Sequence, residues 1–248
     1  MNLTEKNIRE KNFHNKLQSN DKGRFEGIFY KAIFNLNEDF FEFLEKNSKG
    51  SEILDYGCGI GTSTEKVIKY NPKKIIGIDI SEVSINKAKN KAEKLGIDAE
   101  YKVENCENTE FNDNSFDIVY GTGILHHLQF DKCLDEIYRL LKTGGSLVFV
   151  EPLGTNPLIN LYRKFTPQSR SKDEHPLVKK DFNYIQNKFF ETKVRYYGFL
   201  TLIFFPFYQS PVKSKLFKIL SNLDQFLFKF KFFKLFAWSV LITAKKTN

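Results

Sequence analysis

The sequence predicts an α/β fold in which helices cover both faces of a doubly wound, mostly parallel sheet. Short apolar segments alternate with amphipathic segments from residue 51 to 150, which is the pattern of repeated strand and helix units. The connections between them are short enough for right-handed crossovers. The first apolar segment also runs directly into closely spaced glycines, as strands do where a parallel sheet meets a ligand. With 248 residues, the chain can form one such domain with a cap, but not two full domains.

The expected elements follow one another in order. Strands are predicted at 52–56, 74–79, 99–103, 116–121 and 146–151, and helices at 63–70, 82–95 and 131–142. Ser81 is suited to N-cap the second helix, and Gly96 stands just past its end, where a glycine can adopt a left-handed conformation. Both ends of that helix are therefore marked in the sequence.

The segments on either side of this region are expected to cover it. Residues 3–47 predict two or three helices, the last at about 37–45, which would act as a lid. After Pro152, prolines punctuate a polar stretch that is typical of a substrate-side insertion. Three further elements are predicted beyond it, a helix at 178–190 and strands at 191–200 and 237–244.

The most informative motif is the loop Asp55-x-Gly57-x-Gly59-x-Gly61. Glycines at alternate positions let the backbone bend tightly and bring its amides close to a ligand. Folds that bind dinucleotides use G-x-G-x-x-G instead, with the pyrophosphate at a helix N-terminus, so the spacing disfavours an NAD-dependent dehydrogenase. Asp55 would repel a pyrophosphate but accept a hydrogen bond from an ammonium group. The loop therefore favours a nucleoside cofactor that carries an amino acid.

A second acidic residue stands at the expected distance from this loop. The apolar run 75–78 ends at Asp79, where an acidic residue at the tip of the second strand can bind ribose hydroxyls. Taken singly, a glycine-rich loop also suits a tight turn, and Asp79 also suits a helix N-cap. Their order and spacing together predict cofactor binding.

These motifs resemble the class I S-adenosylmethionine-dependent methyltransferases. The resemblance continues through three later segments, which lie at 105–111, 116–128 and 140–152. The chain departs from the common family pattern at Asn105, Cys106 and Thr143, where many members have Asp, Ala and Pro. None of these departures removes a needed group, because Asn105 can still accept and donate hydrogen bonds.

The resemblance implies a single methyltransferase domain with a Rossmann-like, seven-stranded sheet. The segments 191–200 and 237–244 would close this sheet as an antiparallel hairpin. The domain over 1–248 would divide into four parts: an N-terminal helical lid (1–47), a cofactor-binding core (51–152), a substrate-side insertion and cap (153–236) and a closing strand (237–248).

The resemblance also implies S-adenosyl-L-methionine as the methyl donor. Gly57, Gly59 and Gly61 would form the backbone floor of its site. The remaining implied contacts are Asp55 near the methionine ammonium group, Asp79 on the ribose hydroxyls, Ile80 on the adenine ring, Asn105 and Cys106 at the purine edge, and Gly121 and Thr122 beside the methionine portion.

Methyl transfer would be a direct in-line displacement, to which the enzyme mainly contributes positioning. If the acceptor is a hydroxyl group, a histidine base would assist. His126 and His127 follow the fourth strand, beside the expected methyl group, and of the two His127 is preferred. His175 in the insertion is a second candidate catalytic residue, and His14 and Tyr30 in the lid rank third. For each histidine, the alternative is a structural hydrogen bond.

The composition bears on the acceptor, since 15% of the residues are aromatic and many of the 26 phenylalanines lie towards the C-terminus. The segment 200–236 is not required by the minimal fold. Within it, apolar residues recur at helical spacing over 214–232 between lysines. Such a helix suits either a membrane interface or a cap whose phenylalanines form core, and both are compatible with a lipid acceptor. The apolar run at 201–208 is too short to cross a bilayer.

Three classes of function agree with these features. A small-molecule or lipid methyltransferase leads. An RNA or protein methyltransferase is favoured by the net charge of +8, but the chain has no RNA-binding motif, and residues 121–124 lack the Asn/Asp-Pro-Pro-Tyr signature, so no nucleic acid partner is expected. The third class is a non-catalytic, membrane-associated protein that retains the fold.

The expected location is the cytoplasm, with membrane association left open. The three cysteines, Cys58, Cys106 and Cys133, form no close pair, which predicts neither disulfides nor a zinc site, and no metal is expected. The polar N-terminus shows no secretory signal.

Overall fold

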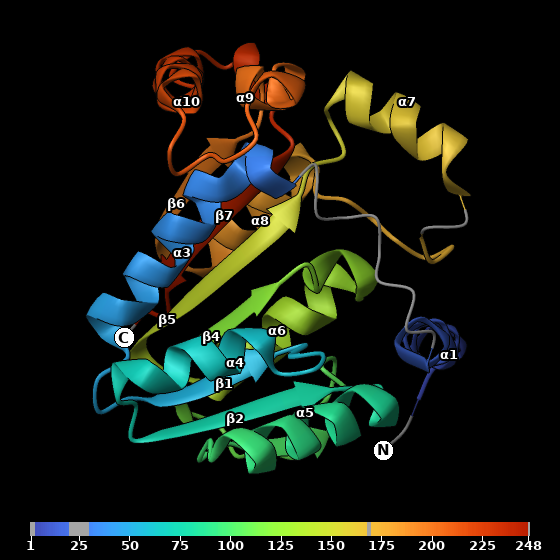
Figure 1. The fold of residues 1–248 in the computed structure, drawn as a ribbon. Helices are drawn as coiled ribbons and strands as arrows, with labels where there is room; N and C mark the ends of the chain where they lie inside the picture. The colour runs from blue at the N-terminus through green and yellow to red at the C-terminus, as the bar shows by residue number, and fades with distance from the viewer. Residues whose placement is uncertain (1–2, 20–29, 168–169, 248) are drawn as a thin grey trace.

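Seven strands form one mixed sheet in the structure, a computed structural model that describes residues 3–19, 30–167 and 170–247. The strand order is β3-β2-β1-β4-β5-β7-β6 (Figure 1). The strands are β1 Glu52–Tyr56, β2 Lys74–Asp79, β3 Glu100–Val103, β4 Phe116–Thr122, β5 Leu141–Pro152, β6 Phe190–Tyr197 and β7 Ser239–Lys245. Only β7 runs antiparallel, between β5 and β6. The predicted seven-stranded, mostly parallel Rossmann-like sheet with a closing hairpin is confirmed.

The helices agree closely with the predicted ones inside the core. They are α1 Glu5–Ser19, α3 Phe34–Asn47, α4 Thr62–Val67, α5 Glu82–Leu95, α6 Phe130–Leu140, α7 Pro157–Phe165, α8 Lys179–Lys188, α9 Leu200–Ile203 and α10 Lys215–Leu227. Short 3-10 helices are η1 Lys31–Ile33, η2 Ile68–Tyr70, η3 Leu125–His127, η5 Phe205–Phe207 and η6 Phe233–Phe236. Ser81 caps α5 by accepting a hydrogen bond from the Ser84 amide, and Gly96 ends it at φ 63°, as predicted.

Both faces of the sheet are buried, which explains the continuous apolar runs in its central strands. One face packs on α6 and α8, for example through Leu134, Ile137 and Ile185. The opposite face packs on α3, whose Leu36, Phe40 and Leu44 are fully buried. Alternate residues of each strand supply the two layers, since successive side chains point to opposite faces.

The two flanking segments differ in part from the lid and cap that the sequence predicts. Helix α3 packs on the sheet as part of the core, whereas α1 lies beyond the ends of the strands (Figure 1). The segment 153–236 contributes β6 to the sheet as well as α7, α9 and α10. These three helices stand at the end of the molecule towards which β5 points (Figure 1).

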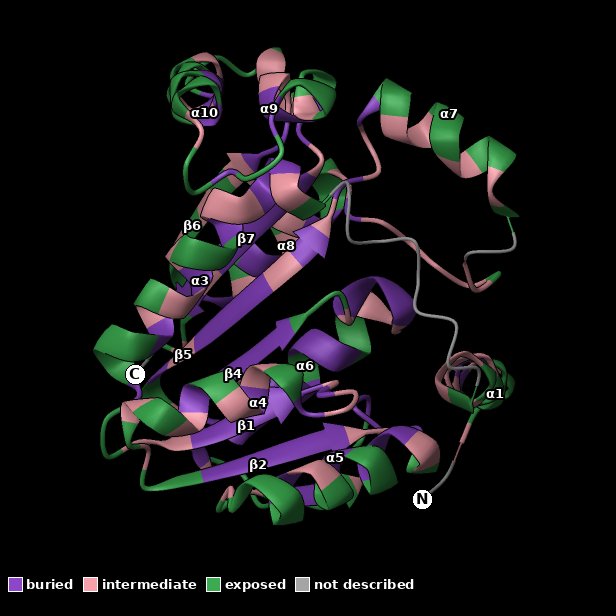
Figure 2. Cartoon of the chain, in the orientation of Figure 1, coloured by how far each residue is buried: buried purple, intermediate pink, exposed green. Residues whose placement is uncertain are grey.

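The outer surfaces of α7 and α10 are largely exposed (Figure 2), and several of their exposed side chains are large and apolar. No helix among the described residues is long and apolar enough to cross a bilayer.

Candidate active site

The glycine-rich loop leaves β1 with all three glycines in left-handed conformations, at φ 75°, 53° and 75°. A Cβ at Gly57 would lie 2.5 Å from Cγ1 of Ile124, and one at Gly61 would lie 2.6 Å from the Tyr101 hydroxyl. A Cβ at Gly59 would meet no atom within 4 Å. The first and third glycines are therefore required by packing, whereas the middle glycine faces open space where a ligand can approach the backbone.

Asp79 is held against this loop by backbone amides. Its Oδ2 accepts a hydrogen bond from the Gly59 amide at 3.0 Å, and its Oδ1 accepts one from the Ser81 amide at 2.8 Å. Burial raises the pKa of Asp79, and the two amide hydrogen bonds partly oppose this. Because Ser81 is the N-cap of α5, Asp79 is not needed for that role.

Asp55 lies beneath the loop and is only 2% exposed. Its Oδ2 accepts hydrogen bonds from the Thr64 hydroxyl at 2.7 Å and from the Tyr120 hydroxyl at 2.9 Å. Burial is the main cause that raises its pKa to about 6. These contacts tie the start of α4 to β4, so Asp55 has a structural role, and its expected contact with an ammonium group stays a prediction.

The other predicted cofactor residues gather at the same ends of the strands. Oδ1 of Asn105 accepts a hydrogen bond from the Glu107 amide at 3.0 Å. The carbonyl of the buried Cys106 accepts one from the Tyr56 hydroxyl. A Cβ at Gly121 would lie 2.6 Å from the carbonyl oxygen of Tyr56. Ile80 follows β2, and the exposed Thr122 ends β4.

Helix α1 lies across these loops through polar contacts. Asn15 accepts a hydrogen bond from the Ser81 hydroxyl at 2.6 Å, and Lys11 forms an ion pair with Glu82 at 2.9 Å. The buried residues of α1 are polar, Asn7 and Glu10. Because the buried face of α1 is polar, a search for hydrophobic periodicity in the sequence does not identify Glu10 as a site residue.

Glu10 places a carboxylate beside the preferred histidine. Its Oε2 lies 3.1 Å from Nδ1 of His127, and both side chains are 6% exposed. Burial raises the pKa of Glu10, but its contacts with His127 and Ser171 outweigh burial, and the pKa lies below its usual value. Glu10 therefore remains ionised and can orient the His127 ring.

The neighbouring histidines have other partners. Nδ1 of His126 lies 2.7 Å from Oε2 of Glu151, whose Oε1 accepts hydrogen bonds from the Ile124 and Leu125 amides. His126 thus helps to hold η3 in place. His175 lies 3.3 Å from Asp181, its side chain is 43% exposed, and it does not line the cavity described below. The catalytic role of His175 stays a prediction, and its position outside the cavity lining does not support that role.

Two groups of side chains near η3 contain metal-ligand types. The donor atoms of Glu10, His14 and His127 lie within 4.8 Å of one another, as do those of His126, His127 and Glu174. The sequence-based expectation that no metal binds remains a prediction.

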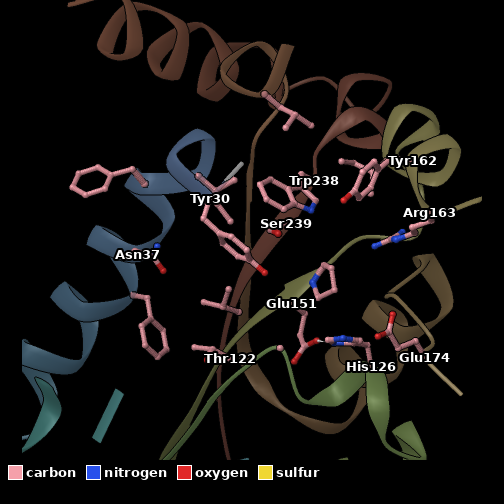
Figure 3. A pocket seen from close by; sticks show the side chains of 18 of the residues that line it. Tyr30, Asn37, Thr122, His126, Glu151, Tyr162, Arg163, Glu174, Trp238 and Ser239 are labelled. Carbon is pink, nitrogen blue, oxygen red and sulfur yellow. Dashed lines mark hydrogen bonds and ion pairs between the residues drawn. The ribbon is translucent and has the colours of Figure 1, made fainter. Parts of the chain in front are cut away.

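A cavity of about 880 Å³ opens above η3, between α3, α7 and the ends of β4 and β5 (Figure 3). Its wall on the cofactor side includes Thr62, Ser63, Thr122 and Gly123. Its aromatic residues are Tyr30, Phe34, Phe40, Phe41, Tyr162, Phe205 and Trp238. Its charged or ionisable residues are Lys66, His126, His127, Glu151, Arg163, Arg170 and Glu174. An apolar and aromatic lining that carries a limited number of polar groups is typical of small-molecule pockets.

A family model described as a methyltransferase domain matches residues 47–199, more than half of the chain. The chain belongs to this methyltransferase family. The match covers the glycine loop, Asp79 and η3, so the resemblance inferred from the motifs is confirmed.

Individual relatives match a smaller part of this methyltransferase. It is 33% identical over 128 residues to 24-methylenesterol C-methyltransferase 2 of Arabidopsis thaliana, covering 50% of this chain and 36% of the relative. It is 35% identical over 129 residues to demethylmenaquinone methyltransferase of Bacteroides fragilis, covering 50% of this chain and 52% of the relative. The chain thus matches about a third to a half of the length of these curated relatives.

The fold is similar to that of geranyl diphosphate C-methyltransferase from Streptomyces coelicolor, whose structure contains Mg²⁺, geranyl diphosphate and S-adenosyl-L-homocysteine. The TM-score is 0.68 at 14% identity, over 98% of both chains. At this identity the likeness shows the fold.

Proposed function

We propose that this methyltransferase domain transfers the methyl group of S-adenosyl-L-methionine to an amphiphilic small-molecule or lipid acceptor in the cavity. The observation that carries the proposal is the position of the cavity, which touches Thr122 and Gly123 at the end of β4 and Thr62 and Ser63 beside the glycine loop. Its volume of about 880 Å³ lies within the usual range for ligand pockets. A partly enclosed, aromatic cavity of this kind disfavours an RNA or protein acceptor.

The residues around the glycine loop fit the proposed cofactor. Open space above Gly59 allows a ligand to approach the backbone, and Asp79 presents a carboxylate at the same point. When bound, S-adenosyl-L-methionine supplies an electrophilic methyl group on a sulfonium centre. The loop and Asp79 would orient that group, and α1 would exclude water from above. Most of the rate enhancement would then come from positioning.

We assign the base, where the acceptor atom carries a proton, to His127. His127 lines the cavity, and the buried Glu10 carboxylate, whose Oε2 lies 3.1 Å from Nδ1, would orient its ring for proton transfer. Glu10 would act as a positioning residue, since it does not line the cavity.

The proposal includes contact with a membrane surface through 200–236. Exposed apolar side chains of this segment include Phe207, Ile219, Phe226, Phe230 and Phe232. Lysines lie among them at positions 213, 215, 218, 229, 231 and 234. Apolar side chains bordered by lysines favour the interface of an anionic membrane, and the neighbouring cavity would then receive an acceptor from the lipid phase.

Two measurements test the function. Calorimetry should show that S-adenosyl-L-homocysteine binds to the purified protein, and absence of binding would overturn the enzyme proposal. Incubation with methyl-labelled S-adenosyl-L-methionine and a lipid extract should then place label in an organic-soluble product. Label in added RNA or protein instead would contradict the proposed acceptor class while leaving the cofactor assignment intact.

A further inference from the structure

Two arginines line one wall of the cavity and take no part in the mechanism described above. Arg163 lies in α7, and Arg170 follows that helix. Both are partly buried and both line the cavity, and Figure 3 shows Arg163 beside the cavity near Glu174 and His126.

The guanidinium of Arg163 uses only part of its hydrogen-bonding capacity. Its Nη1 donates to the carbonyl of Leu153 and to Oδ1 of Asn160, both at 2.9 Å. A guanidinium has five N–H donors, and the three on Nε and Nη2 have no acceptor among the residues that the structure describes. These two nitrogens form the edge that binds carboxylates and phosphates in a bidentate manner. The bonds from Nη1 hold the group in place and leave this edge available.

The positive charge of Arg163 also has no ion-pair partner in the part of the chain that the structure describes. No carboxylate of residues 3–19, 30–167 or 170–247 forms an ion pair with it within 4.0 Å. Burial is the main cause that lowers the pKa of Arg163 to about 10, the charge of Arg170 adds to this effect, and Glu174 partly opposes it. Taking a cation partly out of water without a counter-ion costs free energy, so an anion bound here would be favoured.

Arg170 adds to the positive charge at this wall. Its Nη2 donates to the Thr166 hydroxyl at 3.0 Å, and its Nε lies 3.7 Å from Oε2 of Glu174. This wall therefore combines two guanidinium groups with one nearby carboxylate. Glu151 does not neutralise it, because Glu151 is paired with His126 and with two amides of η3.

The position of Arg163 indicates which part of a ligand would meet it. Leu153, its carbonyl partner, comes directly after β5, and Arg163 itself lies on the side of the cavity where Glu174 and His126 lie (Figure 3). Tyr30 lies towards α3, and Trp238, whose ring centroid is 5.3 Å from that of Tyr30, lies between Tyr30 and Tyr162 (Figure 3). The cavity thus carries Arg163 on one wall and Tyr30 on another. A further lining cation, Lys66, has its Nζ 4.5 Å from the centroid of the Phe41 ring.

We propose that Arg163, assisted by Arg170, binds an anionic group of the acceptor, a phosphate or a carboxylate, so that the acceptor is an anionic amphiphile whose apolar part packs on Tyr30 and Trp238. This inference rests on the proposed function, because it takes the cavity as the acceptor site. The anionic group would fix the orientation of the acceptor relative to the methyl group.

The test uses octyl phosphate, octanoate and octan-1-ol, which share one apolar chain and differ in the head group. Trp238 is the only tryptophan of the chain and lines the cavity, so its fluorescence reports binding to protein saturated with S-adenosyl-L-homocysteine. At least one of the two anions should bind about tenfold or more tightly than the alcohol, and the better one identifies the head group.

Three variants locate the effect. Arg163→Gln should reduce anion binding to the level of the alcohol while leaving alcohol binding unchanged, which also reports an intact cavity. Arg163→Lys should restore only part of the preference, because it keeps the charge and loses the bidentate edge. Lys164→Gln removes the same charge from the exposed neighbouring position and should keep the full preference.

The inference is overturned if the wild-type protein binds the alcohol as tightly as both anions, or if none of the three compounds binds. It is also overturned if Lys164→Gln weakens anion binding as much as Arg163→Gln does. Binding of S-adenosyl-L-homocysteine by calorimetry separates this failure from failure of the proposed function. Normal cofactor binding without anion preference removes only the anionic acceptor, whereas loss of cofactor binding in the wild-type protein removes the function itself.

Discussion

The cofactor region (51–152) and the acceptor region (153–236) are built in different ways. In the cofactor region, the decisive contacts join residues of one loop or of adjacent strands, such as the Gly59 amide and Asp79. In the acceptor region they join distant segments, such as Asn35 of α3 and Ser221 of α10, whose side chains form a hydrogen bond at 2.8 Å across 186 positions of the sequence. The first kind of site follows from contiguous motifs, whereas the second exists only after the chain has folded. Five predictions test this contrast, from the largest expected effect to the smallest.

His127 stands where the two regions meet, and its loss should have the largest effect. His127→Ala should lower methyl transfer to the labelled lipid product by about 100-fold or more, as expected for loss of a general base, with unchanged affinity for S-adenosyl-L-homocysteine. His175→Ala should change the rate less than about twofold, because His175 does not line the cavity. Equal rates of methyl transfer in the wild-type and His127→Ala proteins would show that His127 is not a general base. A larger loss of rate in His175→Ala than in His127→Ala would assign the base to His175 in the insertion.

Gly59 tests the cofactor region alone. Gly59→Ala and Gly144→Ala both place a Cβ at positive φ with no atom within 4 Å, so each should cost about 1 kcal/mol of folding free energy. Only Gly59→Ala should weaken the binding of S-adenosyl-L-homocysteine. The affinity measured by calorimetry should fall by about 100-fold, because the added methyl group fills the space in which the ligand approaches the loop. Similar affinities of the two variants would place the cofactor elsewhere.

The buried Asp55 predicts a pH dependence of stability in the cofactor-free protein. Its pKa is raised from 3.8 to about 6 in the folded state, so the folded protein binds the proton more tightly than the unfolded chain. The Asp55 contribution to stability is therefore most favourable below about pH 4 and is lost as the pH rises to about 6, by about 3 kcal/mol.

Asp55→Asn removes this titration and is the matching variant. Urea unfolding should show that the variant gains stability relative to the wild-type protein between pH 4 and pH 7. A difference between the two proteins that stays constant over this range would contradict the assignment.

Asp224 tests the acceptor region. It accepts hydrogen bonds from the Leu200 amide at 2.7 Å and from the Thr201 hydroxyl at 2.8 Å, which joins α10 to the start of α9. Asp224→Ala should lower the free energy of unfolding by about 1 to 3 kcal/mol, because buried amides lose their acceptor. The exposed Asp98→Ala should change it by less than about 0.5 kcal/mol. If both variants unfold at the same urea concentration, Asp224 does not hold the cap together.

The smallest effect is expected from replacing an exposed apolar side chain of α10, and the quantity measured is binding to lipid vesicles. Phe226→Glu should weaken sedimentation with vesicles of phosphatidylcholine and phosphatidylglycerol by about fivefold, since it places a charge in the apolar contact. Leu95→Glu introduces the same charge at an equally exposed apolar position, 55% against 54%, in the cofactor region and should leave binding unchanged. An equal loss of vesicle binding in both variants would indicate a general effect of charge and would contradict membrane contact through α10.

The sequence predicted the strands and helices of 51–152 closely because their conformations depend on near neighbours. Ser81 and Gly96 bound a helix by interactions within a few residues, and Gly57 and Gly61 adopt positive φ as their spacing suggested. Motif reasoning was less complete for Asp55, whose carboxylate lies beneath the loop and binds Thr64 and Tyr120. Nothing in the contiguous sequence indicates which side of the loop that carboxylate faces.

The flanking segments show why the packing of helices and the contacts between distant residues could not be predicted from the sequence. The apolar spacing near 37–45 correctly indicated a helix, but it could not distinguish a lid from α3, which packs on the sheet. Glu10 lies in a polar helix and gains importance only because α1 docks beside His127.

By itself, the sequence determined the sheet, the glycine-rich loop with Asp79, and membership of a methyltransferase family, because these depend on strand alternation and on backbone conformations set by near neighbours. The tertiary structure alone decided that Glu10 meets His127 and that Arg163 lines a cavity with an edge that no described residue pairs. Such contacts join residues far apart in the chain, so their distances and burial follow from packing and leave no periodic signal in the sequence.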